Sequence, residues 1–353
     1  MTPLERLIRA EIAARGPMPI DRYMDLCLGH PAHGYYMARE PFGEGGDFIT
    51  APEISQVFGE LVAVWCIGQW QAMGEPSAFS LIELGPGRGT LMADLLRAGA
   101  VSPSFRQAAR VHLVETSPRL EALQRERIGD DANWHRALDT VPEGPFVLVA
   151  NEFFDALPIR QFAWQEGGWR ERAIGLADGR LAIVTIAASA GAPAAPGRMS
   201  DIVETSPARS GVARAIGERL ARQKGAALIV DYGHLVPAPG DTLQALRRHR
   251  FAAVTEDPGQ CDITSHVDFA ALAEALEEGG GRSWPALAQG DFLRAMGLEA
   301  RFAALMTGAD HDTAAMLGRA RARLADRDEM GNLFKILAAT SPELPPPYPF
   351  GAP

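Results

Sequence analysis

The chain has 353 residues, of which 47% are hydrophobic and 22% are charged, and its formal net charge at pH 7 is -10. A chain of this length can bury a large core, so we expect one large domain with an appendage, or two domains. The negative charge argues against a nucleic-acid-binding protein, because phosphate contacts need a basic face. It favours a cationic partner instead.

The sequence predicts a cytoplasmic protein without membrane insertion. Its first residues, MTPLERLIRAEIAARG, place acids in an amphipathic helical pattern and lack the apolar centre of a signal peptide. No apolar run approaches the roughly 20 residues that span a bilayer. Cys27, Cys66 and Cys261 are far apart and odd in number, which indicates a reducing compartment and neither a disulfide framework nor a metal cluster.

The predicted elements change in character along the chain. Residues 1–75 are expected to be mostly helical, with a first helix ending at Gly16. After residue 75, short apolar runs alternate with helical patterns, and the runs cover residues 79–84, 109–115, 145–151 and 226–233. This alternation predicts a doubly wound, mostly parallel sheet in an α/β fold.

An insertion interrupts this alternation at about residues 160–210. Short alternating runs broken by Gly-Gly and Asp-Gly between residues 160 and 186 predict antiparallel hairpins. Helical patterns over residues 268–280 and 313–326 then lead to a last strand within residues 332–340. We therefore expect an N-terminal helical region over residues 1–75 and a core over residues 76–353.

The first predicted strand ends in a glycine-rich turn, LIELGPGRGT. Gly85, Gly87 and Gly89 follow Glu83 with the spacing G-x-G-x-G, whereas a dinucleotide fold requires G-x-G-x-x-G and a P-loop requires a terminal Lys-Ser/Thr. The second strand ends in Glu115, 32 residues after Glu83, which suits a βαβ unit and a carboxylate that binds ribose hydroxyls. The pattern favours S-adenosyl-L-methionine as the cofactor, and the alternative is a nucleotide-binding or degenerate Rossmann-like fold. For Glu115 itself, the alternative is an ordinary exposed acid at the end of a strand.

Another predicted strand ends in VANEFFDALP, at the edge of the sheet where open α/β folds bind ligands. Methyl transfer mainly requires a positioned nucleophile whose charge is controlled. If the acceptor is a guanidinium, carboxylates can hold its rigid fork. We expect Glu152 to do this with Asp155 or Asn151, although Asp155 could instead cap a short helix.

These motifs together resemble a known family. GYY, GDFITAPEISQVFGE, ELGPGRGTLMADLLR, NEFFDALP, DYG and DITSHVDF occur in this order between about Tyr23 and Leu337. The set is similar to the MidA-like family of class I methyltransferases, which includes the mitochondrial complex I assembly-factor arginine methyltransferase. The resemblance implies a Rossmann-like, seven-stranded core that binds S-adenosylmethionine. It also implies an arginine on a protein partner, such as a complex I subunit, as the methyl acceptor.

In this family context, the stretch GGDFITAPEIS is expected to be the turn of an N-terminal helical lid. Asp47, Thr50, Glu53 and Gln56 would face cofactor or acceptor, with Glu53 and Gln56 on one helix face because they are three residues apart. Alternatively, Thr50 and Glu53 form a capping box and touch no ligand.

Further polar residues are candidates for the acceptor site. Asp231 and Tyr232 end a strand at the same sheet edge and are candidate walls of that site. His266 is a candidate acid/base group, with capping of the next helix as the alternative. His30 and His33 have a metal-ligand spacing, but their surroundings favour a turn, and we expect no metal.

Two functions rival a protein arginine methyltransferase. One is an assembly factor that keeps the fold and acts by binding a respiratory-complex subunit. The other is a methyltransferase of small molecules.

Overall fold

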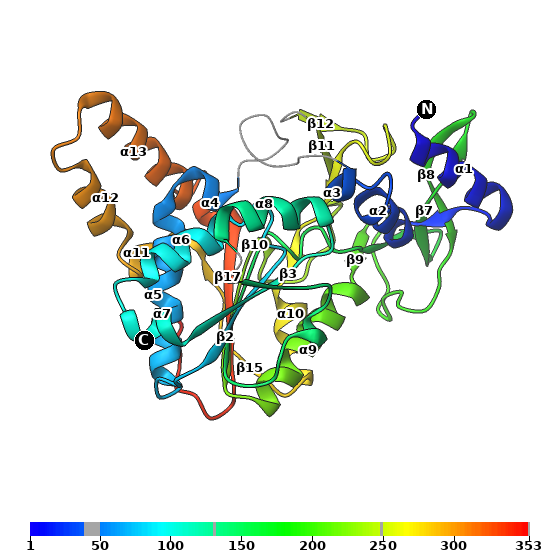
Figure 1. Ribbon diagram of the computed structural model, residues 1–353. Coiled ribbons are helices and arrows are strands. Elements are labelled where there is room, and N and C mark those ends of the chain that lie inside the picture. Colours follow the sequence, from blue (N-terminus) through cyan, green and yellow to red (C-terminus); the bar gives the residue numbers. More distant parts are fainter. Residues whose placement is uncertain (39–49, 130–131, 248–249, 352–353) are drawn as a thin grey trace. The chain divides into compact units, whose positions relative to one another are not determined.

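The computed structural model describes residues 1–38, 50–129, 132–247 and 250–351, and Figure 1 shows its elements. Within this part the chain forms two compact units, each assembled from several segments. The first contains residues 1–38, 155–211, 236–247 and 250–266. The second contains residues 50–129, 132–154, 212–235 and 267–351.

The second unit is an α/β structure built on a mixed sheet. Its main strands run in the order β17-β10-β5-β2-β3-β4. The five strands from β10 to β4 are mutually parallel, and β17 is antiparallel to β10. These strands are β2 (Phe79–Leu84), β3 (Ala109–Val114), β4 (Ala132–His135), β5 (Phe146–Asn151), β10 (Gly225–His234) and β17 (Phe334–Thr340).

The expected count of seven strands is not confirmed, whereas the mixed α/β fold is. The sheet contains nine strands in the described residues, because three two-residue strands pair with β10 and β17. These are β14 (Val267–Asp268), β15 (Arg282–Ser283) and β16 (Leu287–Ala288). Strands this short have no measurable periodicity, so the sequence could not predict them.

Both faces of this sheet are buried, as expected for parallel strands. Leu81, Val147 and Leu228 belong to one apolar cluster with the side chains of α5 (Gln56–Ala72). The alternate residues Ile82 and Leu148 are equally buried but point to the other face. In Figure 1, α5 and α10 (Phe269–Glu278) lie on opposite sides of the sheet.

The remaining helices of this unit connect or flank the strands. They are α4 (Ala51–Ile54), α6 (Thr90–Gly99), α7 (Pro103–Ala108), α8 (Pro118–Ile128), η1 (Leu138–Thr140), α11 (Gln289–Ala295), α12 (Leu298–Met306), α13 (His311–Ala325) and α14 (Met330–Leu333). A further helix, α9 (Pro207–Arg222), begins in the first unit and ends in the second.

The first unit contains helices and two antiparallel sheets. Its helices are α1 (Pro3–Arg15), α2 (Ile20–Gly29) and α3 (Tyr35–Ala38). Its larger sheet holds β1 (Met18–Pro19), β6 (Arg160–Gln165), β7 (Gly168–Ala177), β8 (Arg180–Ala187) and β9 (Ile202–Thr205). The smaller sheet holds β11 (Gln244–Arg247), β12 (Arg250–Ala252) and β13 (Asp262–Thr264).

The predicted hairpins of the insertion are confirmed. Glu166 and Gly167 form the two-residue turn between β6 and β7, with φ of 50° and 81°. Asp178 and Gly179 form the turn between β7 and β8, with φ of 50° and 72°. Two successive residues with positive φ match the twist of the strands that they join, which is why Gly occurs in both turns.

In the described residues, no helix is both long enough and apolar enough to cross a membrane. Cys27, Cys66 and Cys261 are all buried.

Candidate functional site

The predicted site residues of the second unit come from neighbouring parallel strands. β10, β5, β2 and β3 lie side by side in this order. Glu83 lies near the end of β2, Asn151 ends β5, and Glu115 directly follows β3. Because parallel strands end at the same edge, the sheet gathers the segments that carry these groups, as the sequence predicted.

The turn after β2 has a backbone conformation that requires glycine. Gly85, Gly87 and Gly89 have φ of 60°, 53° and 76°, a conformation that strains any other residue. A Cβ on Gly85 would lie 2.8 Å from Cδ2 of Phe153. The turn is therefore closely packed against Phe153 at the start of α6, and a larger residue at position 85 would displace that ring.

Glu83 is a buried carboxylate whose charge is costly. It is 3% exposed, and its Oε2 has no hydrogen-bond partner among the described residues. Burial, reinforced by the nearby charge of Glu115, raises the pKa of Glu83 to about 8. A buried carboxylate with an unmatched oxygen fits a cationic ligand, because a positive charge would favour its ionised form.

Glu115 is held by donors on two sides. Its Oε1 accepts from the backbone N–H of Ser117 at 2.7 Å, and its Oε2 accepts from Nε2 of Gln124 at 3.2 Å. Burial raises the pKa of Glu115, and these hydrogen bonds oppose that rise. Glu115 is 7% exposed, so it is not the ordinary exposed strand-end acid that the sequence left open. A carboxylate has about four acceptor positions, so Glu115 can also accept from a diol.

These observations fit the cofactor that the sequence indicates. S-adenosylmethionine carries cationic groups and a ribose. The glycine turn offers backbone in a conformation that only glycine adopts easily, Glu83 offers a buried carboxyl group that a cation would ionise, and Glu115 offers an oriented acceptor for hydroxyl groups.

The loop after β5 holds Glu152 in a strained conformation. Glu152 has φ of 48°, a region that residues other than glycine rarely occupy. Its backbone N–H donates to the carbonyl of Val230 at 2.9 Å. Its Oε1 accepts from the N–H of Ala51 and from Nδ2 of Asn151, both at 3.2 Å. Strained residues that the surroundings fix in place are concentrated at functional sites.

Asp231 supports this loop from beneath. It is fully buried, its Oδ2 accepts from the N–H of Phe154, and its Oδ1 accepts from its neighbour's N–H in the backbone, both at 3.0 Å. The ring of Tyr232 is also buried and packs edge-on against Phe334, with 5.4 Å between centroids. The structure thus gives Asp231 a role in fixing the loop, and its place as a wall of the acceptor site stays a prediction.

The segment that was expected to be the lid turn differs from its prediction. Ser55 has an extended backbone and separates α4 from α5, so the expectation that Glu53 and Gln56 share a helix face is wrong. Thr50 is the N-cap of α4, but its side chain makes no capping hydrogen bond, so the alternative of a capping box is not supported. Gln56 is exposed. Asp47 lies outside the described residues.

Glu53 has a partner in the glycine turn. Its Oε1 lies 3.6 Å from Nη1 of Arg88, which stands between Gly87 and Gly89. The short helix α4 therefore contacts both predicted halves of the site: its first N–H reaches Glu152, and its carboxylate reaches the cofactor turn.

Asp155 and His266 belong to the first unit. Arg209 donates to the backbone carbonyl of Asp155 at 3.0 Å and to that of His266 at 2.7 Å. No helix begins directly after Asp155 in the described chain, so its alternative as a helix cap is wrong. His266 does not cap the next helix either, because Asp268 accepts from the backbone N–H groups of Ala270 and Ala271.

The sequence analysis missed Gln124 and Arg88. Gln124 is fully buried on α8, four residues after the buried Leu120. A polar residue on the apolar face of a helix is the signal that could have identified it. Arg88 gave no such signal, because its partner Glu53 lies in another element.

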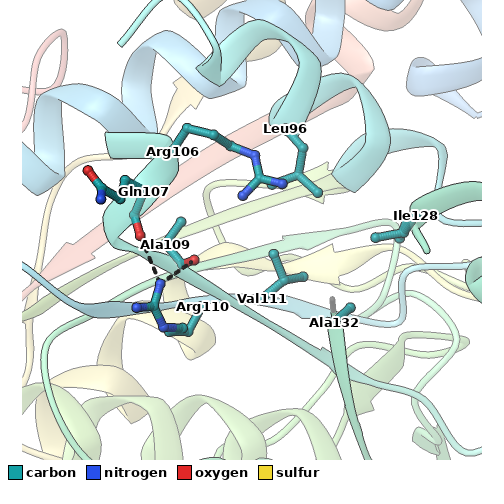
Figure 2. A pocket seen from close by; sticks show the side chains of 8 residues that line it. All are labelled: Leu96, Arg106, Gln107, Ala109, Arg110, Val111, Ile128 and Ala132. Atoms are coloured by element: carbon teal, nitrogen blue, oxygen red, sulfur yellow. Dashed lines mark hydrogen bonds between the residues drawn. The ribbon is translucent and has the colours of Figure 1, made fainter. Parts of the chain in front are cut away.

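A pocket of about 320 Å³ lies elsewhere on this unit, and Figure 2 shows its lining. It includes Ala109 and Ala132, the first residues of β3 and β4, together with Arg106 and Arg110. These residues mark the amino ends of the strands, whereas the glycine turn and Glu115 follow the carboxyl ends. The pocket is therefore separate from the candidate site. The described residues contain no group of three or more potential metal ligands.

The chain is similar to known methyltransferases. Residues 61–286 match the protein family described as "Putative S-adenosyl-L-methionine-dependent methyltransferase". The chain is 36% identical to "Protein arginine methyltransferase NDUFAF7 homolog, mitochondrial" of Drosophila melanogaster, over 95% of this chain and 84% of the relative. It is 35% identical to the protein arginine methyltransferase NDUFAF7 of Homo sapiens, over 87% of this chain and 76% of the relative.

Among solved structures, the chain resembles a Burkholderia thailandensis protein crystallised with S-adenosyl-homocysteine. The TM-score is 0.83 and the identity is 32%, with 96% of this chain and 91% of that chain covered.

Proposed function

The chain belongs to this family of S-adenosyl-L-methionine-dependent methyltransferases, and from that premise we propose that its methyl acceptor is an arginine side chain of a protein. The observation that carries the proposal is the similarity to relatives named protein arginine methyltransferase, at 35–36% identity over most of both chains. The chemistry of the loop after β5 supports it.

We assign the cofactor to the edge formed by β2 and β3. Bound S-adenosylmethionine supplies a methyl group attached to a positively charged sulfur. The turn at Gly85, Gly87 and Gly89 would lie against it, Glu115 would accept hydrogen bonds from its ribose hydroxyls, and Glu83 would face its cationic end.

Glu152 and Asn151 are the proposed acceptor groups for the guanidinium. A guanidinium presents N–H donors in a planar fork, which two adjacent oxygen acceptors can hold. Asn151 Oδ1 is buried without a hydrogen-bond partner among the described residues, while Asn151 Nδ2 already donates to Glu152. The Asn151 amide therefore orients the carboxylate and offers a second acceptor. Asp155, three residues after Glu152, stays a predicted partner.

The carboxylate of Glu152 also suits the proton balance. A guanidinium that gains a methyl group must lose a proton to keep a single positive charge. An anchored carboxylate oxygen can attract that proton and hold the guanidinium plane, so that the attacking nitrogen faces the methyl group. The N–H of Ala51 and the amide of Asn151 fix the position of this oxygen.

We propose that the segment from Thr50 to Gln56 acts as the turn of a lid. Its contacts with Glu152 and Arg88 support this role, because they link it to both halves of the site. A complex I subunit as the acceptor and a cytoplasmic location remain predictions from the sequence.

The proposal is tested by transfer of labelled methyl from S-adenosylmethionine into proteins of a lysate from a strain that lacks this gene. The wild-type chain and Glu152→Gln are compared, and each labelled band is hydrolysed to amino acids. We expect label in methylated arginine that the variant fails to produce. Label confined to low-mass compounds would support a small-molecule methyltransferase. Cofactor binding without any transfer would support an assembly factor that acts by binding.

A further inference from the structure

We infer that Gln124 on α8 is a positioning residue for the cofactor, because its amide joins the backbone of the glycine turn to the carboxylate of Glu115. The inference rests on the proposed assignment of Glu115 to the cofactor ribose. None of the motifs or comparisons assigns a role to Gln124.

The Gln124 amide uses its donors and its acceptor inside the protein. The side chain is fully buried. Its Nε2 donates to the carbonyl of Gly87 at 2.7 Å and to Oε2 of Glu115 at 3.2 Å. Its Oε1 accepts from Nε1 of Trp134 at 2.9 Å. One side chain thus contacts both proposed cofactor-binding elements, the turn after β2 and the acid after β3.

Trp134 determines which way the amide points. An indole nitrogen can only donate, so the amide atom that faces it must be the oxygen. The NH₂ group must then face Gly87 and Glu115, and both of these present acceptors. The orientation of the amide, which distances alone leave ambiguous, is therefore fixed by its three partners. The guanidinium carbon of Arg125 lies 3.8 Å from the centroid of the Trp134 ring and covers it.

The glycine turn also packs against side chains of α8. A Cβ on Gly89 would lie 3.4 Å from Cγ of Gln124 and 3.0 Å from Cδ1 of Ile128. The glycine turn therefore sits directly against α8. A shift of this helix would move the turn and break the hydrogen bond of Gln124 with Glu115. Gln124 therefore sets the distance between the glycine turn and Glu115, the two elements proposed to contact the cofactor.

The pH dependence of cofactor binding distinguishes a positioning role for Gln124 from a purely structural role. The Gln124 N–H stabilises the ionised form of Glu115, so its removal should raise the Glu115 pKa further. The other groups that act on Glu115 are the opposing carboxylate of Glu83, the attracting guanidinium of Arg136, and the backbone N–H groups of Thr116 and Ser117. These remain in a Gln124 variant, so a change in the pH dependence of binding reports the lost amide.

The experiment is calorimetric titration of the full chain with S-adenosyl-homocysteine across the pH range in which the protein stays folded. Gln124→Met keeps the length of the side chain but removes its donors. We expect it to weaken binding about tenfold, the loss of roughly one hydrogen bond to a charged group, and to move the acidic limit of binding to higher pH. Glu126→Gln, an exposed position on the same helix, is the matched control and should bind like the wild type.

Wild-type affinity in Gln124→Met would overturn the inference, and so would a loss of equal size at every pH. If Gln124→Met fails to fold, Trp134→Phe provides the test, because it removes the donor that orients the amide while keeping an aromatic ring at this position. We expect a weakening of about threefold, and an unchanged affinity would overturn the inference. Glu115→Gln is measured beside them. Wild-type affinity in Glu115→Gln would refute the cofactor assignment itself, whatever the Gln124 variants do.

Discussion

The proposed cofactor edge at β2 and β3 and the proposed acceptor loop, residues 152–154 after β5, are held by different means. The side chain of Gln124 connects the cofactor elements, and its partners there lie 37 and 9 residues away in the sequence. The acceptor loop depends on Ala51 and Asp231, whose bonds span 101 and 77 residues, and it stores strain at Glu152. The contacts that hold the cofactor edge thus join residues closer in the sequence than those that hold the loop, so the loop depends more on the complete fold.

The largest expected effect separates catalysis from cofactor binding. Glu152→Gln should reduce methyl transfer by about 10²–10³-fold, the usual cost of removing one electrostatic group that acts on the reacting centre. Glu166→Gln is the matched control, since Glu166 has nearly the same backbone conformation, with φ of 50°, in an exposed hairpin turn. Initial rates with labelled cofactor measure both. Equal rates for the two variants would show that Glu152 does not act on the acceptor.

Substitution of Asp231 tests how this residue supports the loop after β5. Asp231→Leu removes the carboxylate that accepts from the backbone N–H groups of Phe154 and Tyr232, so it should lower the free energy of unfolding by about 3 kcal/mol. Asp231→Asn keeps one acceptor oxygen and should lose less. Urea denaturation measures both, and wild-type stability of the leucine variant would contradict the supporting role.

The sequence correctly predicted the strands and turns that are marked by a pattern in neighbouring residues. The runs at 79–84 and 109–115 locate β2 and β3 to within one residue, and the glycine spacing predicted the turn after β2, whose role in cofactor binding stays a prediction. The motif resemblance to class I methyltransferases is confirmed by the family match. The acceptor loop was predicted as a segment, but its contacts with Ala51 and Asp231 could not be, because nothing in a single sequence pairs distant positions.

Ser55 shows how one residue can defeat a helical pattern. The spacing of three residues suggested that Glu53 and Gln56 lie on the same helix face. The Ser55 side chain instead accepts from the N–H of Val57 and starts a new helix. Because serine is a preferred N-cap, Ser55 could have indicated the start of a new helix at this position.

The buried acid of the cofactor edge predicts a proton linkage. The pKa of Glu83 is raised to about 8, so the ligand-free folded state holds a proton that the unfolded state releases above its ordinary pKa of 4.5. Stability of the ligand-free protein should therefore fall as pH rises through this window. A cationic ligand favours the ionised form, so binding near pH 7 should release up to about one proton.

Calorimetry of S-adenosylmethionine binding in buffers of different ionisation enthalpy measures that proton. Glu83→Gln serves as the control, because it removes this titrating group and should reduce the dependence of the binding enthalpy on buffer. A binding enthalpy that does not vary with buffer in the wild type would contradict the linkage.

The smallest expected effect concerns the ion pair between the two halves. Arg88 and Glu53 are partly exposed and 3.6 Å apart, so their coupling should be only about 0.5–1 kcal/mol and should weaken with salt. A double-mutant cycle of Arg88→Gln and Glu53→Gln, read out as S-adenosyl-homocysteine affinity, measures this coupling. Additive effects of the two substitutions would show that the pair does not link α4 to the cofactor turn.

The most direct test of the division between the two regions is the affinity for S-adenosyl-homocysteine of Glu115→Ala and Glu152→Gln. Loss of two hydrogen bonds to a carboxylate, worth about 3 kcal/mol, should weaken binding roughly 100-fold in Glu115→Ala while the protein stays folded. Glu152→Gln should bind like the wild type. Unchanged affinity in Glu115→Ala, or a comparable loss in Glu152→Gln, would contradict the account.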